Sequence, residues 1–537
     1  MRLRSSATIL LVAATALAPS DVDAQMPPIG TSTTPAPDAV EILAEAVDAI
    51  STMHMEAFSD SLLWEAAIDG LIESLNDPYA ELFTPVEAEA WEEETTGNYS
   101  GIGLQITLLN DEVTVTAVFR GTPAEDIGIV EGDVIVGVNA HDASDWDTGM
   151  TADSIRGPVG STVNVRFKRP GYENPLAYTI KRAEVHVPAV NYGVMEGNIG
   201  YVVLDRVARN AAREMNEALA ELQSTSGLVI DLRRNPGGFL DESLMLADLF
   251  LKPGSTLAST VQRAAGGGVG ENSTDSYNDR WPQLVPDLPI IILVDRYTAS
   301  GAEILAGALQ DYDRAIVVGE RSFGKGVVQT VMPLPHNRRL RFTTGSWHTP
   351  LGRSLQRNRD RQLRPIEEDI DTFPRVTTPG GRQLINGGGI FADLEVADDT
   401  LTLRERELIQ YSGENQFPLA LRLAETGFAI AAVRRDANAP ASVSDDDFSS
   451  FMSALSSEGL PAEFADDPAL RDYLNWRLRM TVAARMNDLG AEADFRRERD
   501  PVLTEAIRLL GTTTSQAELF EAVDGINERR ASEKGGS

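Results

Sequence analysis

The sequence has 537 residues, of which 42% are hydrophobic and 24% are charged, a composition typical of soluble globular proteins. Its length exceeds what one hydrophobic core serves and predicts roughly three or four domains. The net charge is −34 at pH 7, so we expect no binding to nucleic acid or to anionic lipid. The absence of cysteine excludes disulfides, thiolate metal sites, a cysteine nucleophile and a lipid anchor on cysteine.

The first 24 residues have the organisation of a signal peptide. Arg2 and Arg4 form a basic start, residues 7–18 are apolar, and Ala24 ends a sequence suited to cleavage. The apolar stretch is shorter than the about 20 residues that span a bilayer. We therefore expect an exported protein, periplasmic or extracellular, with no integral membrane span. The proline-rich residues 25–38 are typical of a linker.

Residues 39–96 form the predicted N-terminal helical region. Apolar residues recur at helical spacing from Ile42 to Leu71, and the pattern breaks at Asn76-Asp-Pro-Tyr79. Such helices either pack on the core or form a contact between subunits, and the pattern does not choose between them.

Residues 97–185 change to short β-type runs, which predict a small β domain. The candidate strands are 114–118, 134–138, 163–167 and 178–181. The stretch resembles a PDZ domain, because Ser100-Gly-Ile-Gly-Leu104 matches the carboxylate-binding loop and GTPAEDIGIVEGDVIVGVN (121–139) matches the central signature of that family. The alternative is a β domain without this binding role.

The PDZ resemblance implies a site for the C-terminus of a peptide. The backbone of Gly101, Ile102, Gly103 and Leu104 would bind the terminal carboxylate, and Leu104 and Ile106 would line a pocket for the last side chain. The expected partners are protein or peptide substrates with free apolar C-termini.

Residues 186–400 alternate between strand and helix patterns. Strands are predicted at 199–204 and 228–232, with helices around 215–222 and 240–251. This alternation predicts an α/β core with a largely parallel sheet covered by helices.

The Asn235-Pro-Gly-Gly238 sequence follows the second of these strands. Open α/β sheets place ligand-binding loops at the carboxyl ends of their strands. The sequence is either an ordinary tight turn or half of an oxyanion hole, in which Gly237 or Gly238 donates a backbone N–H and Gly301 donates the other.

A serine and a lysine mark two turns in the stretch from Ile290 to Thr330. A β run at 290–294 leads to Ser300, which opens a helical pattern, and a second β run at 315–318 leads to a turn at 319–326 that holds Lys325. β-type sequence resumes at Val327.

Two interpretations of Ser300 compete. Ser300-Gly-Ala-Glu303 is a capping box, which needs no chemistry. A serine at a helix N-terminus is also well placed for nucleophilic attack, since the free N–H groups stabilise an oxyanion. The five histidines show no triad spacing, whereas a buried Lys325 with a lowered pKa can act as the base.

Two other motifs overlap the lysine turn. Gly319 to Lys325 nearly matches a P-loop, but Gly326 replaces the required Ser or Thr and a β-type sequence follows. Ser322-Phe-Gly-Lys325 matches S-x-x-K of the penicillin-recognising enzymes, but the companion S-D-N and K-T-G tripeptides are absent from the sequence. Both assignments are therefore disfavoured.

Taken together, the motifs resemble those of the carboxyl-terminal processing peptidases, which are Ser-Lys peptidases of the tail-specific protease type. The resemblance covers about residues 38–400 and is carried by NDPY (76–79), the PDZ loop, DLRRNPGG (231–238), VDRYTASGAEILAGALQD (294–311), GERSFGKGVVQT (319–330), TPLGRSLQ (349–356) and GGGIFADLEV (387–396).

This resemblance implies a ClpP/crotonase-like peptidase core with an inserted PDZ domain, and it implies roles for individual residues. Ser300 is the nucleophile, Lys325 the general base and Gln329 the group that orients the lysine. Asp311 occupies a supporting position. No metal and no cofactor are expected. The chain departs from the usual pattern at Gly301, Arg234 and Ala392, none of which is part of the Ser-Lys pair.

Residues 401–537 are predicted to form a helical C-terminal domain. An amphipathic helix is expected between Asp467 and Gly490, and two more at 501–510 and 516–526. This region would be a lid, a dimer element or a surface for an adaptor, and the partners it suggests are an adaptor or a second copy of the chain.

The sequence thus predicts an exported serine endopeptidase that recognises protein C-termini through its PDZ domain and cleaves by acyl-enzyme chemistry. The alternative is a catalytically silent PDZ binding or scaffold protein. Retention of both Ser300 and Lys325 disfavours this alternative, since a scaffold needs no lysine in that turn.

Overall fold

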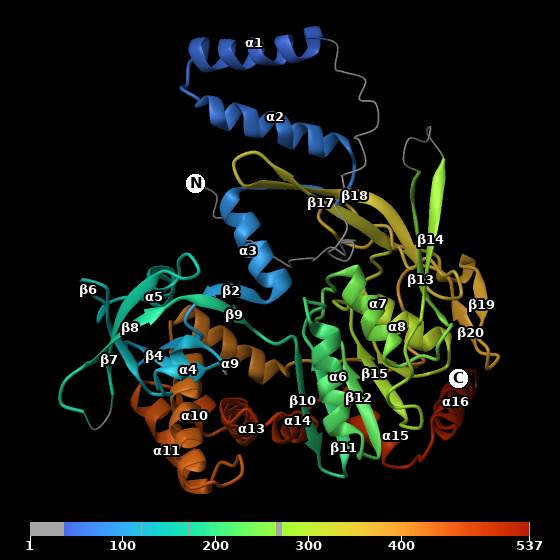
Figure 1. The fold of residues 1–537 in the computed structure, drawn as a ribbon. Helices are drawn as coiled ribbons and strands as arrows, with labels where there is room; N and C mark the ends of the chain where they lie inside the picture. The colour runs from blue at the N-terminus through green and yellow to red at the C-terminus, as the bar shows by residue number, and fades with distance from the viewer. Residues whose placement is uncertain (1–36, 120, 170–171, 265–270, 536–537) are drawn as a thin grey trace.

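The structure is a computed structural model that describes residues 37–119, 121–169, 172–264 and 271–535. Its centre is a six-stranded sheet in the order β10-β11-β12-β15-β16-β21, in which β10 is antiparallel to β11 and the other neighbours are parallel (Figure 1). These strands are β10 (Val190–Met195), β11 (Ile199–Leu204), β12 (Gly227–Asp231), β15 (Ile290–Val294), β16 (Ile316–Gly319) and β21 (Leu394–Glu395). The predicted parallel sheet is confirmed.

Both faces of this sheet are buried, as its continuous apolar strands require. Leu228 and Ile230 of β12 pack in the cluster formed with α6 (Ala211–Leu222), α7 (Leu240–Asp248) and α8 (Gly301–Asp311). Val229, which points the opposite way because side chains alternate along a strand, packs with residues of α14 (Leu489–Arg496), α15 (Pro501–Leu510) and α16 (Gln516–Gly535).

The helices after residue 400 therefore divide between two cores. The last three cover the peptidase sheet, whereas the earlier ones enclose an apolar cluster of their own that includes Phe451, Leu474 and Leu478. These earlier helices are α9 (Leu403–Glu414), α10 (Leu419–Asp436), α11 (Asp445–Ser457), α12 (Ala462–Ala465) and α13 (Pro468–Arg485). In Figure 1 they lie below the small β domain and beside the sheet.

A second, antiparallel sheet flanks the first in the order β1-β18-β13-β14, with β17 paired to β18. Its strands are β1 (Glu81–Phe83), β13 (Thr256–Arg263), β14 (Asn272–Asn278), β17 (Val327–Leu334) and β18 (Arg338–His348). β1 falls in a stretch whose pattern is otherwise helical, because Pro78 ends the helical sequence and residues 81–83 pair with β18.

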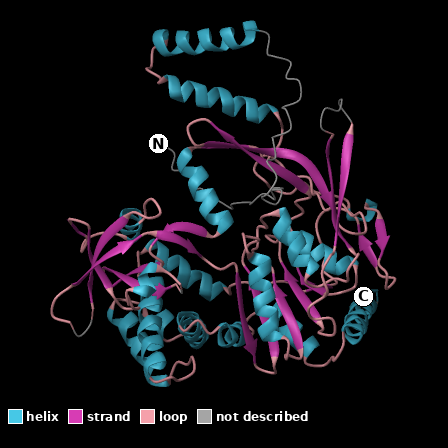
Figure 2. Cartoon of the chain, viewed as in Figure 1, coloured by secondary structure: helices cyan, strands magenta, loops and turns pink. Residues whose placement is uncertain are grey.

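The small β domain contains all four predicted strands (Figure 2). It comprises β3 (Leu104–Leu109), β4 (Glu112–Val118), β5 (Val134–Val138), β6 (His141–Asp142), β7 (Thr162–Lys168) and β8 (Leu176–Lys181), with α4 (Pro123–Asp126) and α5 (Thr148–Ile155). The pair β2 (Asn98–Gly101) and β9 (Ala183–His186) connects it to the rest of the chain.

From residue 37 onward, three helices precede this domain, α1 (Pro37–Met53), α2 (Asp60–Ser74) and α3 (Pro85–Thr96). α1 and α2 project as a hairpin (Figure 1), and α2 has no buried residue. The predicted signal peptide and most of the predicted linker lie outside the described residues. A short segment after β18 contains η1 (Ile370–Thr372), β19 (Arg375–Thr377) and β20 (Gln383–Ile385). Within the described ranges, no helix combines the length and apolar character needed to cross a bilayer.

Candidate active site

The turn between β15 and α8 holds Ser300 in an unusual backbone conformation. Ser300 has φ 51° and ψ −115°, a combination that an L-residue keeps only when its surroundings enforce it. Asp295 fixes the start of the turn, because its Oδ1 accepts the N–H groups of Tyr297 at 3.0 Å and Thr298 at 2.9 Å. Strained residues of this kind cluster at functional sites, so the conformation of Ser300 points to a function.

The Ser300 side chain is fully buried, and its Oγ has no hydrogen-bond partner among the described residues. Its N–H donates to Glu303 Oε2 at 2.8 Å, so the carboxylate contact of the capping box is present. A serine that serves only as a cap uses its oxygen to accept an N–H of the first turn. An unpaired buried hydroxyl costs free energy, which favours the interpretation as a nucleophile.

Glu303 joins the serine turn to the lysine turn. Besides Ser300, this buried carboxylate accepts hydrogen bonds from Ser322 Oγ at 2.5 Å and from the N–H groups of Gly324 at 2.7 Å and Lys325 at 2.8 Å. Burial raises the pKa of Glu303, and the hydrogen bonds oppose that shift. The sequence predicted Glu303 as a capping residue only, and it did not indicate the hydrogen bond from the Lys325 N–H.

Lys325 is buried beside the ring of Tyr79. Its side chain is fully buried, and Nζ is 5.1 Å from the centroid of the Tyr79 ring. Burial, followed by the nearby Arg341 guanidinium, holds the pKa of Lys325 well below its usual value, although Asp77 and Glu303 act in the opposite direction. A lowered pKa leaves more of the amine neutral near pH 7, and only the neutral amine accepts a proton.

Gln329, in β17, contacts the same tyrosine as the lysine does. Its Nε2 donates to the Tyr79 carbonyl at 2.8 Å, and its buried Oε1 has no hydrogen-bond partner in the described ranges. Asp77 positions Tyr79 by accepting its N–H at 3.0 Å, and it also accepts the N–H of Thr343 in β18 at 2.9 Å. The Asn76-Asp-Pro-Tyr79 motif therefore builds one wall of the lysine pocket, a role that the sequence did not reveal.

The Asn235 to Gly238 loop lies directly against the serine turn. Asn235 accepts the N–H of Ala299 at its carbonyl, at 2.9 Å, and its Nδ2 donates to Leu204 at 2.7 Å. No side chain fits at Gly237, where a Cβ would lie 2.6 Å from the Gly301 nitrogen and 2.8 Å from Ser300 Cβ. The loop therefore lies against the backbone of Ser300 and Gly301.

The two glycines of the loop differ in the use of their N–H groups. Gly237 donates to Asn235 Oδ1 at 2.8 Å, so its N–H is already occupied. Among the described residues, no hydrogen bond uses the N–H of Gly238 or that of Gly301. The nitrogen of Gly238 lies 3.1 Å from the position of a Cβ on Gly301, which brings these two N–H groups together beside Ser300.

Asp311 lies at the far end of α8 from the serine. It forms an ion pair with Arg353 at 2.7 Å, and both side chains are fully buried. Its Oδ2 accepts the N–H of Leu351 at 2.8 Å, and Gln356 of the same segment accepts the N–H of Gly326 beside the lysine at 2.9 Å. Asp311 therefore anchors the 349–356 segment against α8, and it does not belong to the serine and lysine turns.

The predicted carboxylate loop lies between β2 and β3. Gly101 ends β2, Gly103 has φ 90°, and Ile102 is buried in the core of the β domain. Leu104 and Ile106 lie on β3, partly buried against that core. Among the described strands only β4 pairs with β3, so the other edge of β3 is the edge at which an added peptide strand would pair.

Comparisons with known proteins agree with these features. Residues 198–372 match the model of peptidase family S41, and residues 100–179 match the model of the PDZ domain. A carboxy-terminal-processing protease of Bartonella bacilliformis is 34% identical over 313 residues, which cover 57% of this chain and 70% of that protein. A probable CtpA-like serine protease of Staphylococcus epidermidis is 33% identical over 296 residues, covering 55% of this chain and 58% of that protein.

Among solved structures, the photosystem II D1 C-terminal processing protease is 25% identical, with 66% of this chain and 92% of that chain covered and a TM-score of 0.34. The fold and the sequence matches together define a serine-type peptidase that carries a PDZ domain. The chain belongs to peptidase family S41, among the carboxy-terminal-processing proteases.

Proposed function

We propose that this chain is an exported serine endopeptidase that selects proteins by their C-terminal tails and cleaves them through Ser300 and Lys325. The observation that supports the proposal is the pair of turns whose backbones share Glu303 as an acceptor: one turn carries a buried serine hydroxyl without a hydrogen-bond partner among the described residues, and the other carries a buried lysine with a lowered pKa. The signal-peptide pattern of the first 24 residues supports export.

The first half of the reaction forms an acyl-enzyme. Neutral Lys325 Nζ accepts the proton of Ser300 Oγ while the oxygen attacks the scissile carbonyl carbon. The N–H groups of Gly238 and Gly301 stabilise the resulting oxyanion. The intermediate collapses as the C–N bond breaks, and protonated Lys325 gives its proton to the leaving amine.

The second half of the reaction releases the product. A water molecule gives a proton to Lys325 and attacks the ester carbon, and the oxyanion forms in the same site. Collapse of this intermediate breaks the bond to Ser300, whose oxygen takes back the proton. The product then ends in a new carboxylate. Gln329, held by the Tyr79 carbonyl, orients the lysine through its amide oxygen.

The PDZ domain supplies the selection of substrates in this proposal. A substrate tail adds to the free edge of β3, its terminal carboxylate binds at Gly101 to Leu104, and its last side chain enters the pocket beside Leu104 and Ile106. The expected substrates therefore have free apolar C-termini. The projecting α1–α2 hairpin, which exposes Ile42, Leu62 and Trp64, is the surface that a second subunit or an adaptor would cover.

The test compares the wild-type enzyme with Ser300→Ala and Lys325→Ala on a protein substrate with an apolar tail. Each change should lower turnover by about 10²- to 10⁴-fold or more, and the double variant should lose no more than either alone, because the two groups act as a unit. Ser224→Ala and Lys252→Ala, at exposed positions, serve as controls. Undiminished turnover by Ser300→Ala would exclude the mechanism, whereas a wild-type protein that binds tails without cleaving them would support the scaffold alternative.

A further inference from the structure

A cavity of about 940 Å³ lies between the peptidase sheet and the C-terminal helices. The carboxyl ends of β11 and β12 and the turn after β15 form one wall, with Asp205, Arg234 and Asp295. Helices α13 and α14 form the other, with Trp476 and Arg477. The Ser-Lys dyad does not line it. Open α/β sheets bind ligands outside the carboxyl ends of their strands, and the volume is that of a ligand pocket.

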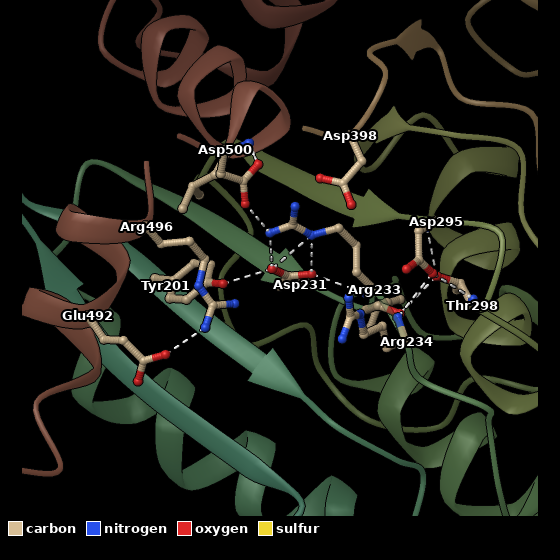
Figure 3. Close-up of polar contacts among 12 residues, drawn as sticks. Tyr201, Asp231, Arg233, Arg234, Asp295, Thr298, Asp398, Glu492, Arg496 and Asp500 are labelled. Atoms are coloured by element: carbon tan, nitrogen blue, oxygen red, sulfur yellow. Dashed lines mark hydrogen bonds and ion pairs between the residues drawn. The ribbon is translucent and has the colours of Figure 1, made fainter. Parts of the chain in front are cut away.

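Most charged groups in these walls are already paired (Figure 3). Arg233 forms ion pairs with Asp231 and Asp500, both at 2.7 Å, and Arg496 pairs with Glu492 at 2.6 Å. The Arg233–Asp500 pair connects the end of β12 to the start of α15, whereas the Arg496–Glu492 pair lies within α14. The walls are therefore held in place without a ligand.

Arg234 and Arg477 differ from the other arginines of the cavity, because neither forms an ion pair with a carboxylate of the described residues. Arg234 is exposed and lines the cavity, and its only hydrogen bond to a described residue is donated by its backbone. Arg477 donates to the Tyr473 hydroxyl at 2.8 Å. Guanidinium groups bind carboxylates with two parallel hydrogen bonds, so both side chains are available to an anionic ligand.

Arg234 also connects the cavity to the oxyanion loop. It has φ 62°, a left-handed conformation, and its N–H donates to Asp295 Oδ1 at 3.0 Å. That oxygen also holds the turn that leads to Ser300. Arg234 is followed directly by Asn235, the first residue of the loop that carries Gly238. A ligand on Arg234 would therefore contact the backbone that positions the oxyanion site.

The other residues of the cavity wall indicate which class of anionic ligand the cavity suits. Asp205 is accessible to water, yet burial raises its pKa, as expected for a carboxylate inside a concave site. Asp398 and Asp399 line the same cavity, and together with Asp205 they repel a doubly charged anion and accept hydrogen bonds from N–H donors. Tyr192 and Trp476 add aromatic surface. A peptide, which has N–H groups, an apolar body and a single carboxylate, fits this combination better than an inorganic anion does.

We propose that this cavity binds a peptide carboxylate through Arg234 and Arg477, as a second peptide-recognition site beside the PDZ domain. The proposal rests on the proposed function, since a peptidase meets carboxylates both on acidic side chains of its substrates and on the new C-termini of its products. The helical wall lies beyond residues 198–372, the part that matches the peptidase family, so the C-terminal region of this chain completes the site.

Calorimetric titration of the full chain tests the proposal, in the Ser300→Ala background so that peptides are not consumed. The decisive probe is acetyl-Ala-Asp-Ala-amide, which has a carboxylate but no free C-terminus for the PDZ domain. Its neutral match is acetyl-Ala-Asn-Ala-amide, and inorganic phosphate tests for a general anion site. Acetyl-Ala-Ala-Ala with a free carboxylate represents a product end.

Arg234→Gly and Arg477→Gln should each weaken binding of the carboxylate peptide at least tenfold, because each removes a guanidinium. Glycine tolerates the left-handed backbone at position 234, so the first change removes the side chain without straining the loop. Arg213→Gln, at an exposed position of α6, is the control and should bind as the parent does. If Arg234→Gly lowers the Tm of the protein, its weaker binding could come from a perturbed fold, and the binding measured for Arg477→Gln then tests the proposal.

The arms separate the possible outcomes. Binding of the aspartyl amide, lost in the arginine variants, assigns acidic side chains as ligands, whereas arginine-dependent binding of the free-acid peptide alone assigns chain termini. Binding of the aspartyl amide that is unchanged in both variants, or phosphate binding as tight as binding of the aspartyl amide, would overturn the proposal. Because the readout is binding by a Ser300→Ala protein, it is independent of whether Ser300 and Lys325 perform the hydrolysis.

Discussion

The backbone N–H groups of Ser300 and Lys325 donate to the same oxygen, Oε2 of Glu303, each at 2.8 Å. The separation of the proposed nucleophile and base is therefore set by the backbone of two turns that share one buried anchor. Catalytic groups need such support, because a displacement of about 1 Å can cost about 10²-fold in rate.

Glu303→Gln should lower kcat by about 10²-fold with little change in KM. In glutamine, one carboxylate oxygen is kept as an acceptor and the other is replaced by an NH₂ group. That NH₂ group faces backbone N–H groups that the carboxylate oxygen had accepted, and two donors cannot pair, so the serine and lysine turns separate. Steady-state kinetics on a protein substrate measures this effect. Glu221→Gln, at an exposed position of α6, is the matched control. A glutamine variant with the wild-type kcat would show that Glu303 does not position the pair.

The strands that build this site were predictable from sequence because their patterns are local. The apolar run 290–294 coincides with β15, and the run 199–204 coincides with β11, since a short, mostly apolar run between turn residues is typical of a buried strand. The surface against which the C-terminal helices pack was not predictable from the sequence. The apolar face of 501–510 is clear in the sequence, but nothing local indicates that it covers Val229 of the sheet.

In the candidate site, too, some residues were predictable from local patterns and others were not. Ser300, Lys325 and the glycine loop each lie in a turn that has a recognisable pattern. The residues around the lysine have no such pattern. Tyr79 contacts Gln329 from a position 250 residues away in the sequence, and Arg341, which acts on the lysine, lies on a separate strand. Long-range pairing of this kind is fixed by the tertiary fold, so the sequence predicted a buried lysine base without showing that Tyr79 and Arg341 would lie beside it.

Lys325→Met should raise the thermal stability of the protein near neutral pH. Burial holds the pKa of Lys325 well below its usual value, so between the folded pKa and the unfolded value of about 10.4 the unfolded chain binds a proton that the native state does not. The wild type is therefore destabilised at low pH and gains stability as the pH rises through this window. Methionine removes that dependence.

Calorimetric Tm values across the pH range measure the difference between the two proteins. The advantage of Lys325→Met should be largest at the lowest pH at which both fold, and it should shrink toward about pH 10. Lys252→Met, at an exposed lysine, should show no such trend. In the wild-type enzyme kcat/KM should rise with pH through the same lowered pKa, since only neutral Lys325 accepts the serine proton. A Tm difference that does not depend on pH would contradict the lowered pKa.

Gly238→Val should lower kcat far more than it weakens substrate binding. A Cβ at this position would lie 1.9 Å from the Val207 carbonyl oxygen, so the loop must shift and carry the Gly238 N–H away from the oxyanion. Loss of one such donor costs about 3 kcal/mol of stabilisation that exists only in the transition state. Rapid kinetics that separates binding from turnover measures the effect.

Gly254→Asn is the control for this change, because that glycine also has a positive φ but has open space around it. Asparagine tolerates such a conformation, and the variant should keep its kcat. An unchanged kcat in Gly238→Val would mean that the loop is only a tight turn.

The PDZ domain should bind peptides that end in Ala, Val or Leu with micromolar affinity, about −8 kcal/mol, in the full-length Ser300→Ala protein. Amidation of the peptide, or a terminal Asp, should weaken binding at least tenfold, roughly 1.4 kcal/mol, because an amide leaves the donors of Gly101 to Leu104 poorly paired. Ile106→Thr should also weaken binding, since it shortens the apolar wall on β3.

Arg234→Gly should leave this binding unchanged and so distinguish the PDZ groove from the cavity. In the active enzyme the same peptide changes, made on a substrate tail, should slow cleavage at a distant internal bond. Equal affinity for free-acid and amidated peptides would rule out the carboxylate loop even if the Ser-Lys chemistry holds.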